Sequence, residues 1–145
     1  MIKSGSCFYY KEKSCIIGAV ISLNGLHYIV AASHIFKGAG DRVEVDGMEV
    51  AVTTTLKDFD LALIELPTCC NIELTDFGSA ALLEEAFLVN NNHVIKCRVL
   101  SAGASLLYLS FPYSDMPQPG DSGSPILQAG KVIRFISSAL LTDCM

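Results

Sequence analysis

The sequence contains no tryptophan, no long hydrophobic run and no cluster of basic residues. Its longest apolar stretches, such as residues 15–21 (CIIGAVI), have the size of a β-strand, whereas a membrane-spanning helix needs roughly 18 apolar residues. The net charge is −5, and the ten Lys and Arg residues are scattered along the chain. A nucleic-acid-binding protein usually gathers such residues on one surface. We therefore expect neither a membrane span nor a nucleic-acid partner.

Signals for secretion and for a disulfide framework are also missing. The charged N-terminal residues 1–13 are followed by no apolar segment typical of a secretory signal. No C-x-x-C spacing occurs, and two of the six cysteines are adjacent, which favours reduced thiols. The cysteines are Cys7, Cys15, Cys69, Cys70, Cys97 and Cys144. We expect an intracellular protein, or one released from a longer precursor. The sequence does not indicate an oligomeric state.

No recognisable ligand spacing indicates a metal site. A zinc site built from Cys69, Cys70 and His93 would be the nearest candidate, but these residues do not follow a known pattern of zinc ligands. We therefore predict no metal and no cofactor.

Short apolar and alternating segments dominate the 145 residues, a length typical of one domain. The pattern predicts strands over 15–23, 26–32, 41–46, 48–56 and 60–66, then over 86–91, 93–100, 105–111, 124–128 and 132–137. Two-residue turns are expected at 24–25, 46–47 and 129–130, where Asn, Asp or Ala precedes Gly. Only residues 79–87 (SAALLEEAF) have the composition of a helix. Many short strands with tight turns indicate an all-β barrel or sandwich.

The least strand-like part of the chain lies around residues 67–85 and divides the sequence near its middle. We interpret it as a linker between two similar all-β halves, over 1–72 and 80–145, within a single domain of residues 1–145.

Residues 117–127 (PQPGDSGSPIL) place Ser122 in a turn between two glycines. A serine hydroxyl is a weak nucleophile until a base takes its proton, and the oxyanion that then develops needs two N–H donors. Gly120 can bring its N–H close because it has no side chain, and the turn through Asp121 can aim the N–H of Ser122 the same way. On its own, the motif fits equally well a polar turn between two strands.

The base for such a serine would be one of three histidines. His34 follows a buried-strand pattern and comes just before a loop, and the end of a strand is a rigid place to hold a base. His27 follows the 24–25 turn and His93 follows three asparagines, so both are typical of hairpin turns.

A carboxylate that orients the histidine would complete the group. Asp60 begins an alternating apolar strand, and we favour it over Asp58, which we expect to face water. Chain order argues against two other hydrolase arrangements. No histidine follows Ser122, as the order Ser–acid–His requires. No aspartate precedes His34, so the order Asp–His–Ser would need His93, which has no supporting context. The order His34, Asp60, Ser122 remains.

Residues 29–36 (IVAASHIF), 59–66 (FDLALIEL) and 120–126 (GDSGSPI) together resemble the three catalytic motifs of chymotrypsin-like serine proteases. The resemblance extends over nearly the whole chain. It implies two antiparallel β-barrels packed together, over 1–72 and 80–145, with the active site in the cleft between them. The first barrel would supply His34 and Asp60. The second would supply Ser122 and the oxyanion donors, which are the N–H groups of Gly120 and Ser122. The resemblance also implies that Ser137, Ser138 and Ala139 pair with the substrate backbone.

The sequence departs from the family at several positions. Ile35 and Gln118 stand where secreted members often carry cysteines, and no activation junction is present. The family counterpart of Asp121 pairs with a newly formed N-terminal amine, so Asp121 is expected to find another partner here. The chain after Ser122 is short for the family. We expect a shortened C-terminal barrel, and a barrel completed by a partner and a truncated chain are the open alternatives.

The resemblance also bears on specificity. Met116 stands six residues before Ser122, at the base of the substrate pocket in trypsin-like members, and it offers no carboxylate to a basic side chain. An apolar or uncharged residue is therefore expected before the cleaved bond, unless Pro117 and Pro119 reshape the pocket.

These observations favour a serine endopeptidase that acts on a peptide or protein through an acyl-enzyme intermediate. Two alternatives stay open. One is a precursor protease that cleaves itself once and is then inhibited by its own C-terminus. The other is a non-catalytic peptide-binding module on the same fold.

Overall fold

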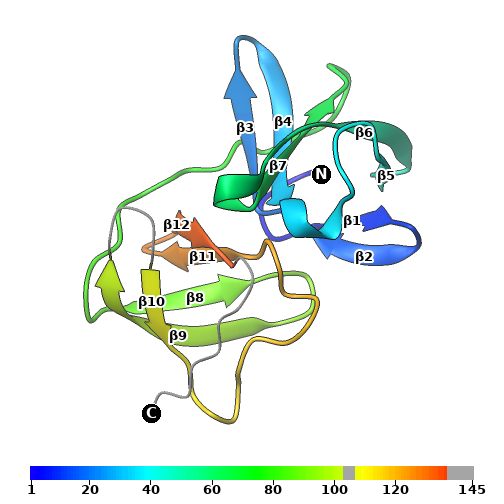
Figure 1. The fold of residues 1–145 in the computed structure, drawn as a ribbon. Coiled ribbons are helices and arrows are strands. Elements are labelled where there is room, and N and C mark those ends of the chain that lie inside the picture. The colour runs from blue at the N-terminus through cyan, green and yellow to red at the C-terminus, as the bar shows by residue number, and fades with distance from the viewer. Residues whose placement is uncertain (103–106, 137–145) are drawn as a thin grey trace.

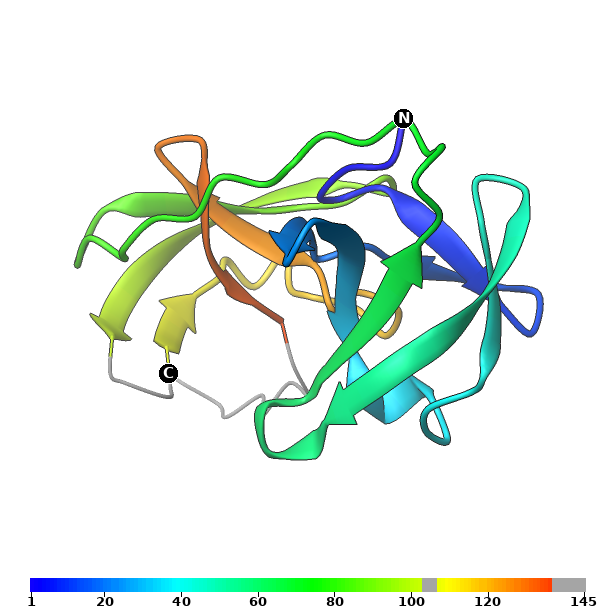
Figure 2. The ribbon, with the colours of Figure 1, turned by 90° about the horizontal axis from the view of Figure 1, so that it is seen from above.

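The structure is a computed structural model that describes residues 1–102 and 107–136. These residues form twelve strands and two single-turn 3₁₀ helices, and the strands build two antiparallel sheets, one from each half of the chain (Figure 1). Each sheet curls into a half-barrel, and the two half-barrels pack side by side (Figures 1 and 2). Among the described residues, no helix has the length and apolar character needed to cross a membrane.

The first sheet has seven strands in the order β2-β1-β5-β6-β7-β4-β3. The strands are β1 (Cys7–Tyr10), β2 (Lys13–Ile16), β3 (Ala19–Leu23), β4 (Leu26–Ala32), β5 (Arg42–Val45), β6 (Met48–Leu56) and β7 (Leu61–Leu66). The long strand β6 pairs with β5 through its first half and with β7 through its second, and its register against β7 shifts between Val52 and Thr54. A shift of this kind increases the local twist of a strand, so β6 can belong to both walls of the curled sheet.

The second sheet has five strands in the order β10-β9-β8-β11-β12. The strands are β8 (Glu85–Val89), β9 (Val94–Ala102), β10 (Leu107–Ser110), β11 (Pro125–Gln128) and β12 (Lys131–Phe135). Register shifts interrupt the β9–β10 pairing and the β11–β12 pairing, and both bend this smaller sheet.

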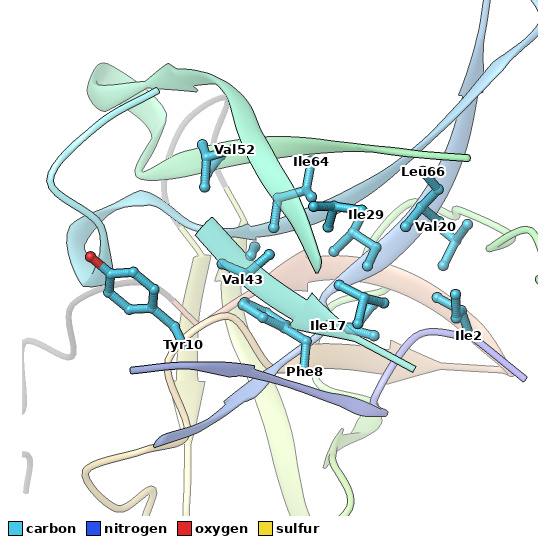
Figure 3. Packing of buried hydrophobic residues seen from close by; sticks show 14 residues of the cluster. Ile2, Phe8, Tyr10, Ile17, Val20, Ile29, Val43, Val52, Ile64 and Leu66 are labelled. Carbon is cyan, nitrogen blue, oxygen red and sulfur yellow. The ribbon is translucent and has the colours of Figure 1, made fainter. Parts of the chain in front are cut away.

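Alternating sequence patterns place one face of each sheet in a core. In β9 the residues alternate between exposed and buried over the first six positions, as expected for a strand with one face on the core. The core of the first half-barrel is built mainly from branched aliphatic side chains together with the rings of Phe8 and Tyr10 (Figure 3). Its fully buried members include Phe8, Ile17, Val20, Ile29 and Ile64.

The three predicted two-residue turns are present, and both residues of each turn have positive φ. The values are 51° and 81° at Asn24 and Gly25, the same at Asp46 and Gly47, and 53° and 77° at Ala129 and Gly130. These angles belong to the type I′ turn, whose twist matches that of a two-stranded ribbon. The turn residues therefore fix the register of three hairpins.

Two sequence-based expectations differ from the structure. The predicted strand 15–23 is divided into β2 and β3 at Ile17 and Gly18, where the chain leaves one wall of the sheet for the other. There the N–H of Gly18 bonds to the carbonyl of Val30 and the N–H of Ile17 to the carbonyl of Ser6. Residues 79–87 form no helix. Their last three residues begin β8, in which the side chain of Ala86 is fully buried in the core.

The connection between the sheets, residues 67–84, runs along one side of both half-barrels (Figure 2). It forms a β-bridge to the N-terminus between Ile72 and Ile2, and a second bridge to β12 between Phe77 and Val132. Between these bridges, Thr75 both donates to and accepts from the backbone of Val20 in β3. The connection thus covers the outer edges of β3 and β12 and joins the two half-barrels.

The half-barrels also meet backbone to backbone where Gly18 faces the loop before β11. A Cβ atom on Gly18 would lie 2.8 Å from the carbonyl oxygen of Gly123 and 2.8 Å from the ring of Phe135. Gly123 has φ +85°, and a Cβ atom there would lie 3.2 Å from the backbone nitrogen of Ala32. Only glycine allows this approach, which brings the loop around Gly123 against the end of β4.

We predict that Gly18→Ala lowers the free energy of unfolding by about 1–3 kcal/mol, because the new methyl group forces backbone apart in a close-packed interface. Chemical denaturation monitored by tyrosine fluorescence measures the loss. The matched control is Gly38→Ala, since a Cβ atom at Gly38 meets nothing within 4 Å. Equal stability of the two variants would contradict the close contact.

Candidate active site

His34 and Asp60 lie at the same end of two neighbouring strands. The β4–β7 ladder ends with the pair Ala32 and Leu61, and the next N–H, that of Ser33, donates to the carbonyl of Asp60. Beyond the ladder the chain turns into the 3₁₀ helix η1 (Ser33–Ile35), which carries His34. On the other strand, the 3₁₀ helix η2 (Lys57–Phe59) ends at Asp60, whose φ of 54° and ψ of 41° are left-handed. Aspartate tolerates this conformation better than most residues.

The side chains of His34, Asp60 and Ser122 form a continuous chain of hydrogen bonds. Nδ1 of His34 lies 2.8 Å from Oδ2 of Asp60, and Nε2 of His34 lies 3.0 Å from Oγ of Ser122. An ionised carboxylate can only accept hydrogen bonds, so Nδ1 carries the imidazole proton and Nε2 is free to accept from the serine. This arrangement can remove a proton from the Ser122 hydroxyl.

The carboxylate of Asp60 is partly exposed to water and accepts hydrogen bonds from three donors of the protein. Its Oδ1 accepts from the Ser33 hydroxyl at 3.0 Å and from the N–H of His34 at 2.9 Å, while Oδ2 accepts from the His34 ring. Partial burial alone would raise the pKa of Asp60. The hydrogen bonds from His34 and Ser33 outweigh burial and hold the pKa below the usual value for an aspartate. Asp60 is therefore ionised at neutral pH.

The nucleophile loop, residues 118–124, leaves two of its N–H groups without a partner. The N–H groups of Gln118, Asp121, Gly123 and Ser124 all donate to acceptors within the protein. Those of Gly120 and Ser122 donate to no acceptor in the part of the chain that the structure describes. Gly120 has φ +99° and open space where a side chain would be. The loop therefore carries two unpaired N–H groups, one on Ser122 itself and one two residues before it.

Asp121, next to Ser122, is almost fully buried and is bonded to a hairpin of the second sheet. Oδ1 accepts from Nδ2 of Asn90 at 3.0 Å and from Nε2 of His93 at 2.9 Å, and Oδ2 accepts from the N–H of Gln118 at 2.7 Å. Asp121 does have another partner, as the missing activation junction predicts. From the sequence, Asn90 was not singled out, and His93 was considered only as a zinc ligand or a base, not as a partner of Asp121. Their only signal is the run of three asparagines before His93, which also fits an ordinary turn.

The remaining candidates have clear positions or fall outside the described residues. Asp58 is exposed in η2, and His27 is half-buried in β4, at the far end of the strand from His34. Met116 and Pro117 are half-buried in the loop before Ser122. The expected backbone-pairing residues, Ser137, Ser138 and Ala139, lie outside the described residues.

Within residues 1–102 and 107–136 the structure shows neither a metal site nor a disulfide. No group of three or more His, Cys, Asp or Glu side chains is arranged there to hold a metal ion. The cysteines in these ranges form no disulfide with one another; they are Cys7, Cys15, Cys69, Cys70 and Cys97.

By sequence, the chain matches no family model and no curated protein. By structure it resembles several solved proteases. Thermobifida fusca protease A superposes with a TM-score of 0.69 at 16% identity, over 90% of this chain and 80% of that one. Nocardiopsis protease superposes with a TM-score of 0.67 at 14% identity, over 90% of this chain and 80% of that one. The chain has the chymotrypsin-like fold. The NSP4 proteinase of equine arteritis virus shares this fold, with a TM-score of 0.64 at 15% identity over 96% of this chain and 69% of that one.

We predict that Asp60→Asn destabilises the protein at neutral pH and that this effect disappears in acid. Because the folded state lowers the pKa of Asp60, its ionised form contributes stability above the unfolded pKa of about 3.9. That contribution is lost as the pH falls through the folded value. Denaturant unfolding of wild type and variant between pH 7 and 3 measures the difference. Asp58→Asn, at an exposed carboxylate, is the control; a constant difference across this range would contradict the prediction.

Proposed function

We propose that the protein is a serine endopeptidase that cleaves peptide bonds through an acyl-enzyme intermediate. Ser122 Oγ attacks the scissile carbonyl carbon while Nε2 of His34 takes the hydroxyl proton. The C–N bond then breaks, and His34 returns the proton to the leaving amine. A water molecule, deprotonated by the same nitrogen, hydrolyses the ester on Ser122. Asp60 keeps the imidazole in the tautomer that can accept and stabilises the imidazolium that forms.

The observation that carries the proposal is the unbroken set of contacts from Asp60 through His34 to Ser122, at 2.8 Å and 3.0 Å. The three side chains come from two different half-barrels, and neither barrel needs this alignment to bury its own core. A fold by itself does not determine activity. The bond between base and nucleophile, with the base oriented by a third group, is the feature that distinguishes an activated serine from a polar turn.

The unpaired N–H groups of Gly120 and Ser122 support the same reaction. In the tetrahedral intermediate the carbonyl oxygen becomes an oxyanion, which two fixed donors stabilise more strongly than they stabilise the neutral carbonyl. Every other N–H of residues 118–124 is already bonded within the protein, so these two are the donors available to a substrate. Loss of one such donor typically costs about 10²–10³ in kcat.

For the substrate we propose a peptide or protein with an apolar or uncharged residue before the cleaved bond. Met116, half-buried in the loop that precedes Ser122, provides neither a carboxylate for a basic side chain nor a cation for an acidic one. A peptide library varied at that position tests this specificity. Preferred cleavage after Arg, Lys, Asp or Glu would contradict it without affecting the assignment of the three catalytic side chains.

The decisive experiment is labelling with a fluorophosphonate, which forms a stable bond with an activated serine. We expect stoichiometric labelling of the wild type, none of Ser122→Ala, and at least about 10³-fold slower labelling of His34→Ala, since the base is then absent. Ser114→Ala, at an exposed serine of the preceding loop, is the matched control and should label like the wild type. Labelling that does not depend on Ser122 would overturn the proposal.

Acid should also abolish activity. Protonation of Nε2 of His34 removes the acceptor for the serine proton, so log(kcat/KM) should fall with a slope of one proton as the pH is lowered. Because Asp60 has a lowered pKa, its own protonation adds no second acid limb in this range. Initial rates on a fluorogenic peptide, with folding checked by circular dichroism at each pH, measure the profile. Undiminished activity at pH 5 would contradict His34 as the base.

A further inference from the structure

The residue before the nucleophile carries a buried charge that must be balanced locally. The Asp121 side chain is 4% exposed, and a carboxylate removed from water is costly unless hydrogen bonds and a positive group compensate it. Among the described residues, three groups bond to it: the Asn90 amide, the His93 imidazole and the N–H of Gln118. Of these, only His93 can carry a positive charge.

The hairpin between β8 and β9 is shaped to present these donors. Oδ1 of Asn90 accepts from the N–H groups of Asn92 and His93, at 2.8 Å and 3.1 Å, and so holds the turn in one conformation. The Nδ2 group of the same side chain donates to Asp121 and, at 3.0 Å, to the hydroxyl of buried Ser124. Asn90 is itself 7% exposed and has hydrogen-bonded partners for both ends of its amide. The bonds to Asn92 and His93 are those of an ordinary Asx turn, whereas the bonds to Asp121 and Ser124 reach a distant part of the chain.

Asp121 passes this restraint on to the nucleophile loop. Its side chain bonds to the N–H of Gln118, its own N–H bonds to the carbonyl of Gln118, and its carbonyl accepts from the N–H of Ser124. The three contacts fix the backbone on both sides of Ser122. They therefore set where the hydroxyl lies and where the unpaired N–H groups of Gly120 and Ser122 point.

We propose that His93 is a positioning residue for the active site: by donating from Nε2 to Asp121, it holds the nucleophile loop in the conformation that aligns Ser122 with His34. The proposal rests on the proposed protease function and extends it to a second histidine, which takes no part in the proton transfers of the reaction. His93 touches no reacting atom. It acts through Asp121, and its ring, 30% exposed, stays open to solvent on one side.

The test compares His93→Ala, which removes the donor, with His93→Gln, whose amide can donate to Asp121 in place of Nε2. Displacement of a catalytic group by about 1 Å costs roughly 10²-fold in rate. We expect His93→Ala to lower kcat and the rate of fluorophosphonate labelling together by about that factor, with little change in KM. Both rates should be at least about tenfold higher in His93→Gln than in His93→Ala.

His27→Ala is the matched control, because His27 is a half-buried histidine of the first sheet with no hydrogen bond to a described side chain. Thermal melts of all variants separate a loss of fold from a loss of alignment, and rates are expressed per folded molecule. If the wild type is labelled and folded His93→Ala is labelled at the same rate, this inference is overturned and the protease proposal stands. Absence of labelling in the wild type would overturn the protease proposal itself.

A measurement on the wild type covers the case in which His93→Ala does not fold. Two-bond ¹H–¹⁵N correlation spectra of the histidine rings report which nitrogen carries the proton. We expect the Nε2 proton of His93 to persist at every pH at which the enzyme is active. A neutral His93 ring protonated only at Nδ1 at such a pH could not donate to Asp121, and it would overturn the inference.

Discussion

The close contact between the backbone of Gly123 and that of the first half-barrel is the constraint on which the site depends. A side chain on Gly18 would lie 2.8 Å from the Gly123 carbonyl, and one on Gly123 would lie 3.2 Å from the nitrogen of Ala32. Ala32 ends β4, and His34 follows two residues later. The same contact therefore limits the distance between the strand that leads to His34 and the loop that carries the Ser122 hydroxyl. Side chains at either glycine would widen the gap that a single 3.0 Å hydrogen bond has to close.

Two aspartates then fix the groups on either side of this contact, and they do so by different routes. The donors of Asp60 are its cross-strand neighbours Ser33 and His34, so its geometry follows from the β4–β7 ladder. The side-chain donors of Asp121 come from a hairpin about thirty residues earlier, so its geometry depends on how the second sheet is assembled. In both cases a carboxylate that would be costly to bury is satisfied by donors that also shape a loop. The first half-barrel thus positions His34, and the second positions Ser122.

Much of this arrangement was accessible from the sequence, for physical reasons that can be named. Alternation of apolar residues predicted every strand except β1 at least in part, and Asn-Gly and Asp-Gly pairs predicted their turns, because both signals are local. The division at Gly18 was missed because the apolar run continues through it, whereas the bond to Val30 and the contact with Gly123 form only after folding. Residues 79–87 looked helical because composition does not record that Ala86 faces a core. Asn90 and His93 were missed because their partner, Asp121, is distant in sequence and close only after folding.

The same reasoning explains why the fold can be recognised where the sequence alone matches nothing. A core accepts many apolar side chains of suitable volume, so the strands restrict the sequence weakly. The site restricts it strongly but at few positions: two glycines at the contact, three side chains in line, and a buried aspartate with its donors. These positions are too few to raise the overall identity, yet each is fixed by a distance or a dihedral angle. The proposed activity therefore depends on those geometric requirements and not on overall similarity to any protein of the same fold.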